Sequence, residues 1–142
     1  MSSVSSARRR LVRKKPLNSD ALMADKERPG APVDRSNAEH YVWGDDCDGW
    51  HLLKRRDLSI IAERVPPGAC EVRHVHEKSR QFFFILSGHA VIEVDGRRHE
   101  LEPGQGLEIA PGQAHQFRNE ASAEVHFLVV SQPTTRGDRT DL

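Results

Sequence analysis

The amino-acid sequence predicts an all-β fold, a single sandwich or barrel built from short strands. Turn signals containing Gly, Pro or Asp recur along the chain from Trp50 onward, at intervals of about eight to twelve residues. The segments between them are short and rich in Val, Ile, Leu and Phe. No segment keeps the 3.6-residue apolar periodicity of an amphipathic helix over three turns. Short strands at regular spacing are typical of sandwiches and barrels.

The chain of 142 residues divides into a basic N-terminal segment and a remainder dense in apolar residues. Residues 1–30 contain eight Lys or Arg against three Asp or Glu, without an apolar pattern. Such a segment cannot bury enough surface to offset its ordering entropy, so we expect a disordered basic tail over residues 1–35. Residues 36–142 then form one domain, with the barrel core at about residues 50–132. An organelle transit peptide remains an alternative for the Ser- and Arg-rich start.

The turn signals divide the domain into nine expected strands, and one hairpin is specified by its residues. Asp95 and Gly96 separate two strands, and a type I′ turn requires positive φ at both central positions, which Gly adopts at little cost. The expected strands, in order, cover residues 51–56, 58–65, 70–76, 81–87, 89–95, 97–101, 106–110, 115–119 and 124–131.

The segment before the first expected strand, residues 41–50, is aromatic and acidic and is interpreted as a loop. Asp45, Asp46 and Asp48 could suggest a calcium site. Their spacing does not match an EF-hand loop, so a solvated acidic loop is the favoured interpretation.

Two histidines, His74 and His76, lie two residues apart on an expected strand, so their side chains leave the same face. Two imidazoles in this arrangement can chelate one metal ion, but a pair of exposed histidines on a strand face is an equal alternative. His115 follows the turn signal at residues 110–113, and Gln81 begins the strand after the histidine pair. A closed sheet can bring residues so distant in sequence into contact.

With these residues in place, the chain resembles the cupin superfamily over about residues 45–132. The first cupin motif has the order Gly, His-x-His, Glu, Gly, and it is matched by Gly68, His74, His76, Gln81 in place of Glu, and Gly88. The second has the order Gly, Pro, Gly, His, Asn, and it is matched by Gly104, Ala110 in place of Pro, Gly112, His115 and Asn119.

The resemblance implies a double-stranded β-helix of the jelly-roll kind with a metal inside the barrel. It implies His74, His76 and His115 as ligands, with Gln81 at the usual carboxylate position and Asn119 in a structural role. The metal expected is a divalent transition ion: Zn, Fe, Mn, Ni or Cu. A neutral amide leaves more of the ion's charge uncompensated than a carboxylate does. Two alternatives are that Gln81 only hydrogen-bonds a ligand histidine, and that the site has lost its metal.

The function expected is that of a small metal-binding cupin that holds a small polar molecule in the barrel cavity. An oxygenase or isomerase is one class of interpretation, because the fold hosts many chemistries. A non-catalytic module that binds or senses a small ligand is the second class, and a metal-free structural domain is the third. Whether the chain is an enzyme is left open.

Several other residues carry further predictions. Glu93 and Glu108 are candidate general bases, if their strand faces point inward. His126 is interpreted as a core histidine rather than a cavity residue, and Cys70 as a small buried apolar residue. Residues 81–86 are apolar on both strand faces, which predicts that both faces are buried and that the chain forms a homodimer. Phe82, Phe83 and Phe84 are then expected to pack in the core and in the dimer interface.

The composition also bears on compartment and partners. The two cysteines, Cys47 and Cys70, form no CxxC pair, which favours a reducing, cytoplasmic location. No apolar stretch approaches the roughly 18 residues of a membrane span, so no membrane partner is expected. No nucleic acid is expected either, because no aromatic residues are interleaved with the basic ones of the tail.

Overall fold

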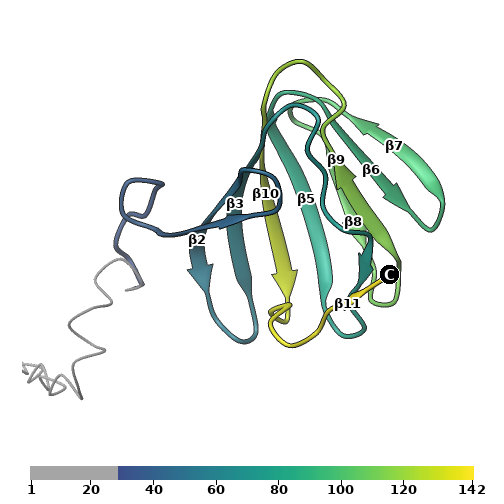
Figure 1. The fold of residues 1–142 in the computed structure, drawn as a ribbon. Helices are drawn as coiled ribbons and strands as arrows, with labels where there is room; N and C mark the ends of the chain where they lie inside the picture. The colour runs from purple at the N-terminus through teal and green to yellow at the C-terminus, as the bar shows by residue number, and fades with distance from the viewer. Residues whose placement is uncertain (1–28) are drawn as a thin grey trace, which may run out of the picture.

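The computed structural model describes residues 29–142, which fold as two antiparallel sheets facing each other (Figure 1). The described part of the chain contains strands and turns but no helix, so the predicted all-β jelly roll is confirmed. Most of the predicted tail, residues 1–28, lies outside the described residues. The strands are β1 (Glu39–Trp43), β2 (Cys47–Lys54), β3 (Ser59–Val65), β4 (His74–Val75), β5 (Arg80–Ser87), β6 (Ala90–Val94), β7 (Arg97–Leu101), β8 (Gly106–Ile109), β9 (His115–Arg118), β10 (Val125–Gln132) and β11 (Thr140–Asp141).

The first sheet has the order β1-β2-β3-β10-β5-β8 and the second the order β11-β4-β9-β6-β7. In both sheets, strands distant in sequence are neighbours: β10 lies between β3 and β5, and β9 lies between β4 and β6. This interleaving brings the histidine strand β4 beside β9 and β11, so residues from three parts of the chain meet.

The apolar core lies between the two sheets, where alternate residues of β5 and β10 point inward. Phe83 and Ile85 of β5 are buried, and they are the cross-strand partners of Val129 and Phe127 of β10. Phe127 stacks on Phe117 of the opposite sheet with ring centroids 4.1 Å apart. At one end of β5 and β10, the cross-strand pair of residues that points inward is polar.

That polar pair is Gln81 and Ser131, which are buried cross-strand partners. The barrel therefore has an apolar end, which supplies most of the burial energy, and a polar end.

The hairpin at Asp95 and Gly96 forms as expected. Both residues have positive φ, 49° and 80°, and they join β6 to β7. Positive φ at both central residues is the requirement of the type I′ turn, so this prediction is confirmed.

The interpretation of residues 41–50 as a loop was wrong, because they form most of a hairpin between β1 and β2. The Tyr41 ring occupies the space above Gly49, where a Cβ would lie only 2.2 Å from a ring carbon. Asp48 accepts hydrogen bonds from Arg64 Nε and His40 Nε2, each at 2.7 Å. It is therefore part of a surface ion-pair cluster, and no calcium site is needed to explain it.

Residues 70–76 form less strand than expected, since only β4 is regular. Before β4, the backbone forms hydrogen bonds with β9 outside a regular strand. The Glu71 N–H, for example, donates to the Phe117 carbonyl at 3.0 Å. Cys70 is exposed, against the prediction of burial, whereas Cys47 is buried.

His126 lies neither in the core nor in the cavity, so that prediction is also corrected. It is half-buried on β10 and contacts Glu124 Oε1 at 2.8 Å and an Arg35 nitrogen at 2.7 Å. The Arg35 guanidinium lies 4.8 Å from the centre of the Trp50 ring. The last residue of the predicted tail therefore already contacts the barrel. Across residues 29–142, no helix long and apolar enough to cross a membrane is found.

Candidate metal centre and ligand cavity

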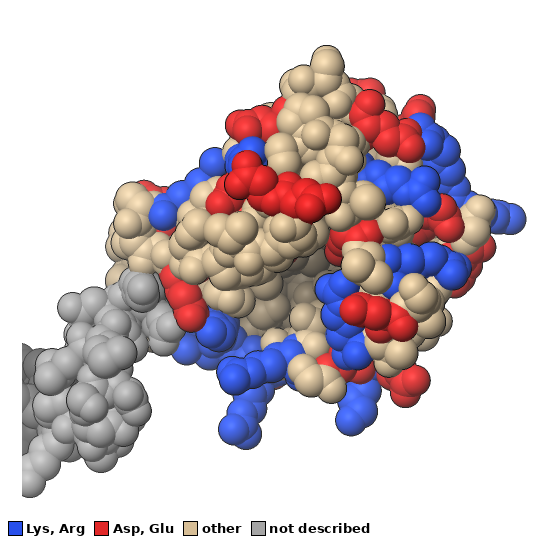
Figure 2. Space-filling view, in the orientation of Figure 1, with Lys and Arg blue, Asp and Glu red and all other residues tan. Residues whose placement is uncertain are grey.

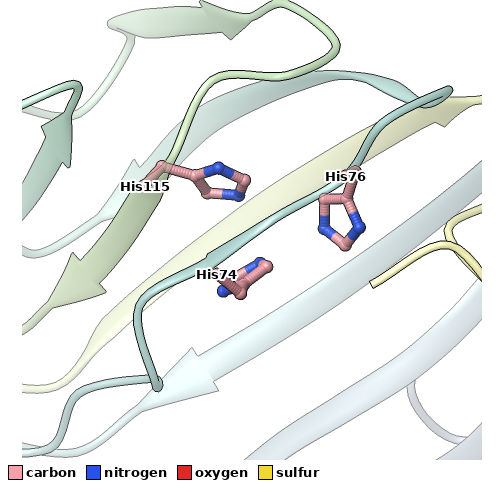
Figure 3. Close-up of side chains that lie close together, drawn as sticks. All are labelled: His74, His76 and His115. Atoms are coloured by element: carbon pink, nitrogen blue, oxygen red, sulfur yellow. The ribbon is translucent and has the colours of Figure 1, made fainter. Parts of the chain in front are cut away.

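Three buried imidazoles converge at the polar end of the barrel. His74 of β4 and His115 of β9 are cross-strand partners, and His76 follows two residues after His74. Figure 3 shows the three rings gathered around a common space. One nitrogen of each ring lies within 4.8 Å of the others, and the three residues are at most 5% exposed.

The orientation of each ring is set by a backbone carbonyl that accepts its Nδ1 proton. His74 Nδ1 donates to Val72 O at 2.7 Å, and His115 Nδ1 donates to Gln113 O at 2.9 Å. His76 Nδ1 donates to Asp138 O. A carbonyl can only accept, so each Nδ1 carries the proton and each Nε2 keeps a lone pair. This is the arrangement that fixes metal-binding histidines in proteins.

Burial keeps these imidazoles neutral. It lowers the pKa of all three, and that of His74 falls to about 4. His115 Nε2 is buried without a hydrogen-bond partner among the described residues, which is costly for a lone pair unless an ion or a ligand satisfies it.

Gln81 lies at the same end of the cavity, on β5 of the facing sheet. Its amide nitrogen donates to Ser131 Oγ at 3.2 Å, so the amide group is fixed and its oxygen is left free. That oxygen, Oε1, is buried and has no hydrogen-bond partner in the described part of the chain. The alternative in which Gln81 bonds a ligand histidine is therefore not the arrangement observed.

The candidate donor set consists of three imidazole nitrogens and an amide oxygen. Imidazole suits Zn, Cu, Fe and Ni, and two of these four side chains carry buried atoms without a partner among residues 29–142. The residues present therefore fit a divalent transition metal.

His74, His76 and Gln81 line a cavity of about 200 Å³. Six further polar residues that were not predicted from the sequence line the cavity: Tyr41, Glu63, Glu71, Ser131, Thr135 and Arg139. Of these, Glu63 had a signal in the sequence, because strict alternation along residues 59–65 places it on the face of the buried Ser59 and Val65.

Glu63 is a carboxyl group held in the cavity wall by Tyr41, whose hydroxyl donates to Oε1 at 3.0 Å. Burial raises the pKa of Glu63 to about 7, although the Tyr41 hydrogen bond opposes the shift. Burial and the Glu63 charge also raise the pKa of Tyr41. A carboxyl group with a pKa near neutrality can both accept and donate a proton at physiological pH.

Glu71 faces the same cavity but is anchored differently. Its Oε1 accepts the Phe117 backbone N–H at 2.9 Å and lies 4.0 Å from His74 Nδ1. Burial, with the Glu63 charge as the second cause, raises the pKa of Glu71 to about 8. Two acidic groups therefore stand beside the histidines.

The C-terminal segment closes one side of the site. The Asp138 carboxylate accepts backbone N–H bonds from Glu77, Lys78 and Ser79, at 2.9 to 3.3 Å. Its carbonyl holds His76, and the following residues pair β11 with β4. Asp138 therefore positions a candidate ligand from 62 residues away, and nothing in the local sequence indicated this.

The two acidic residues predicted as possible general bases lie outside the cavity. Glu108 is exposed and pairs with Arg80 at 2.8 Å, and Glu93 pairs with Arg118 at 3.0 Å. Their strand faces point away from the histidines, so the condition on which they were candidates is not met.

Asn119 is structural, as expected. Its side-chain amide nitrogen donates to the carbonyls of Val65 and Ala123 at 3.0 and 2.9 Å, which ties β9 and β10 to the end of β3.

Comparison with known proteins agrees with this fold. The family model described as Cupin domain matches residues 62–131. An uncharacterised protein of Methanocaldococcus jannaschii is 26% identical over 92 residues, covering 65% of this chain and 74% of that protein. An oxalate-binding protein of Thermotoga maritima is 26% identical over 85 residues, covering 56% of this chain and 70% of that protein.

A solved structure described as a sugar phosphate isomerase from a cupin superfamily, from Silicibacter pomeroyi, superposes with a TM-score of 0.65 at 25% identity. That superposition covers 73% of this chain and 76% of the other.

Proposed function

This chain belongs to the cupin superfamily, and we propose that it binds one divalent transition metal ion through Nε2 of His74, His76 and His115. Gln81 Oε1 is the fourth, neutral ligand. The support is the shared orientation of the rings, whose Nδ1 atoms are all occupied by carbonyls. When bound, such an ion polarises the oxygen atoms of a ligand.

The role of Gln81 as a metal ligand can be tested by replacing its amide with a carboxylate. Gln81→Glu keeps the length of the side chain and adds one negative charge. It should tighten binding of Mn²⁺, a hard ion, more than binding of Zn²⁺, because carboxylate suits harder ions better than an amide does. Calorimetric titration of both ions into both proteins measures this. Equal Mn²⁺ affinities would remove Gln81 from the ligand set.

The reaction we propose is proton transfer on a small hydroxyl- and carbonyl-bearing molecule, an isomerisation. The observation that carries it is the Glu63–Tyr41 pair, which lines the same cavity as His74 and His76. Glu63 accepts a proton from the hydroxyl-bearing carbon and returns it to the former carbonyl carbon. The hydroxyl proton passes to the former carbonyl oxygen. Atoms and electrons balance without any redox partner.

The likeness to a sugar phosphate isomerase at 25% identity supports this reaction class. The second candidate is a non-catalytic module that binds a small ligand, supported by the likeness to an oxalate-binding protein. Of the two, isomerisation accounts for a buried carboxyl group with a pKa near 7 beside the donor set.

Deuterium exchange separates these functions without knowledge of the product. The metal-loaded protein is incubated in D₂O with dihydroxyacetone phosphate, and NMR follows loss of the carbon-bound proton. An isomerase exchanges this proton, whereas a binding module is stabilised by its ligand without exchange. Oxygen uptake in a parallel sample would instead indicate an oxygenase.

We also propose a homodimer built on the outer face of β5. Phe82, Phe84 and Leu86 point outward there and are 44%, 37% and 46% exposed. Sedimentation at micromolar concentration should give twice the chain mass of 16.0 kDa. Phe84→Glu should shift the protein to the monomer, because it places a charge in the apolar patch. A wild-type monomer would contradict the proposal. A cytoplasmic location and the absence of a nucleic-acid partner stay predictions.

A further inference from the structure

We propose that the ligand carries a phosphate group, which binds at the mouth of the cavity against Lys54, Arg56 and Arg136, while its neutral oxygen-bearing end faces the histidines. This inference rests on the proposed function, because it names the substrate class of the same site.

The mouth is continuous with the metal-proximal cavity. Tyr41, Ile61 and Thr135 line both the inner cavity of about 200 Å³ and a second pocket of about 380 Å³. The second pocket shares Lys54 and Arg136 with a third pocket, of about 330 Å³. The face drawn in Figure 2 is hollowed, with Lys and Arg side chains gathered along the lower margin of the hollow. A ligand longer than the inner cavity can therefore extend outward along this path.

The mouth is basic, and part of its charge is uncompensated. The third pocket is lined by Lys54, Arg55, Arg56, Thr134 and Arg136. Lys54 pairs with Glu39 at 2.8 Å, but neither Arg56 nor Arg136 has a salt bridge among the described residues.

The acidic residue in the turn, Asp57, is exposed. A phosphate carries about −1.5 to −2 charges near neutral pH, so it gains from more than one cation, and guanidinium groups bind it in bidentate fashion.

The two basic segments are held together by the fold. The Thr134 backbone N–H donates to the Arg56 carbonyl at 2.9 Å, and the Arg55 N–H donates to Leu58 O at 3.0 Å. The turn after β2 and the segment after β10 therefore keep a fixed relation, which brings Arg56 and Arg136 to one pocket.

The inner cavity has the opposite character. Glu63 and Glu71 lie beside the histidines, and Arg139, which also lines the cavity, is engaged by Asp141 at 2.7 Å. Hydroxyl and carbonyl groups of a ligand can hydrogen-bond with these two acidic side chains, whereas the arginines without an acidic partner among the described residues lie at the mouth. The positions of Arg56 and Arg136 therefore set the direction of the ligand: oxygen-bearing end inward, phosphate outward. A carboxylate at the outer end carries a single charge, so it would gain less than a phosphate from binding to both Arg56 and Arg136.

Binding of matched probes to the metal-loaded protein tests the inference at constant ionic strength. Dihydroxyacetone phosphate should bind at least about tenfold more tightly than dihydroxyacetone, which lacks only the phosphate, and inorganic phosphate should compete. The double variant Arg56→Gln with Arg136→Gln should lose about tenfold or more of the affinity for the phosphate ester. Its affinity for dihydroxyacetone and its metal content should not change. Arg97→Gln, an exposed cation of β7, is the matched control and should behave as wild type.

Equal affinity for the two ketones, or equal loss in the Arg97 variant, would overturn the phosphate site. So would glycerate binding as tightly as the phosphate ester, which would assign a carboxylate to the mouth. Failure of the proposed function would give a different result. If no metal binds at the histidines but the phosphate ester still depends on Arg56 and Arg136, the mouth site stands and the metal proposal fails.

Discussion

Replacing Glu63 with glutamine is expected to lower deuterium exchange into dihydroxyacetone phosphate by about 10²- to 10⁴-fold, the usual contribution of a general base. The amide keeps the shape of the side chain and can still accept the Tyr41 hydrogen bond, but it cannot take up a proton. Metal content should be unchanged. Glu108→Gln, an exposed acid outside the cavity, is the matched control and should retain wild-type exchange.

The pH dependence provides a second measure of the same residue. Exchange should rise with pH through about 7, because Glu63 acts as a base only when it is ionised. The shift also affects stability. The folded-state pKa lies above the usual value of 4.5 for a glutamate, so the folded protein binds more protons between these two pH values. The stability that Glu63 contributes is therefore present below pH 4.5 and lost as pH rises towards 7. Denaturation curves should show a smaller loss of stability between pH 4.5 and about 7 for Glu63→Gln than for the wild type. The same loss in both proteins would contradict the raised pKa of Glu63.

Replacing both His74 and His115 with alanine is expected to abolish metal-dependent stabilisation. An ion present at about 100 times its Kd stabilises the folded state by about 2.7 kcal/mol. That corresponds to roughly 10 °C or more in Tm for a domain of this size. Thermal unfolding with and without added Zn²⁺ measures the difference, which should vanish in the double variant.

His99→Ala, a histidine of β7 outside the cluster, is the control for loss of an imidazole elsewhere. It should keep the full metal-dependent shift. A double variant that is still stabilised by Zn²⁺ to the wild-type extent would place the ion at another site.

The fold could be predicted well from local patterns. Alternation and turn residues indicated most strands, and Asp95-Gly96 specified its hairpin because the requirement for positive φ is local. The hairpin of β1 and β2 was missed for the opposite reason. Tyr41 packs over Gly49 in this hairpin, and an acidic segment with two glycines shows no alternation from which to infer the contact.

The candidate site was predictable in part. His74, His76 and His115 were identified by spacing, and the structure brings them together. Glu63 could have been found from alternation along β3, although alternation does not show that Tyr41 bonds it. The role of Asp138 could not be predicted, because the bond to His76 depends on β11 pairing with β4. Contacts set by strand order across a closed sheet are not encoded in any local pattern.

The central claim is that the histidine cluster holds a metal ion. The most direct test is X-ray absorption spectroscopy on the purified metal-loaded protein, with the metal content measured on the same sample. The account predicts about one divalent ion per chain, with at least three imidazole nitrogens at about 2.0–2.1 Å if the ion is zinc. Protein that takes up no ion, or an ion whose spectrum lacks imidazole ligands, would contradict it.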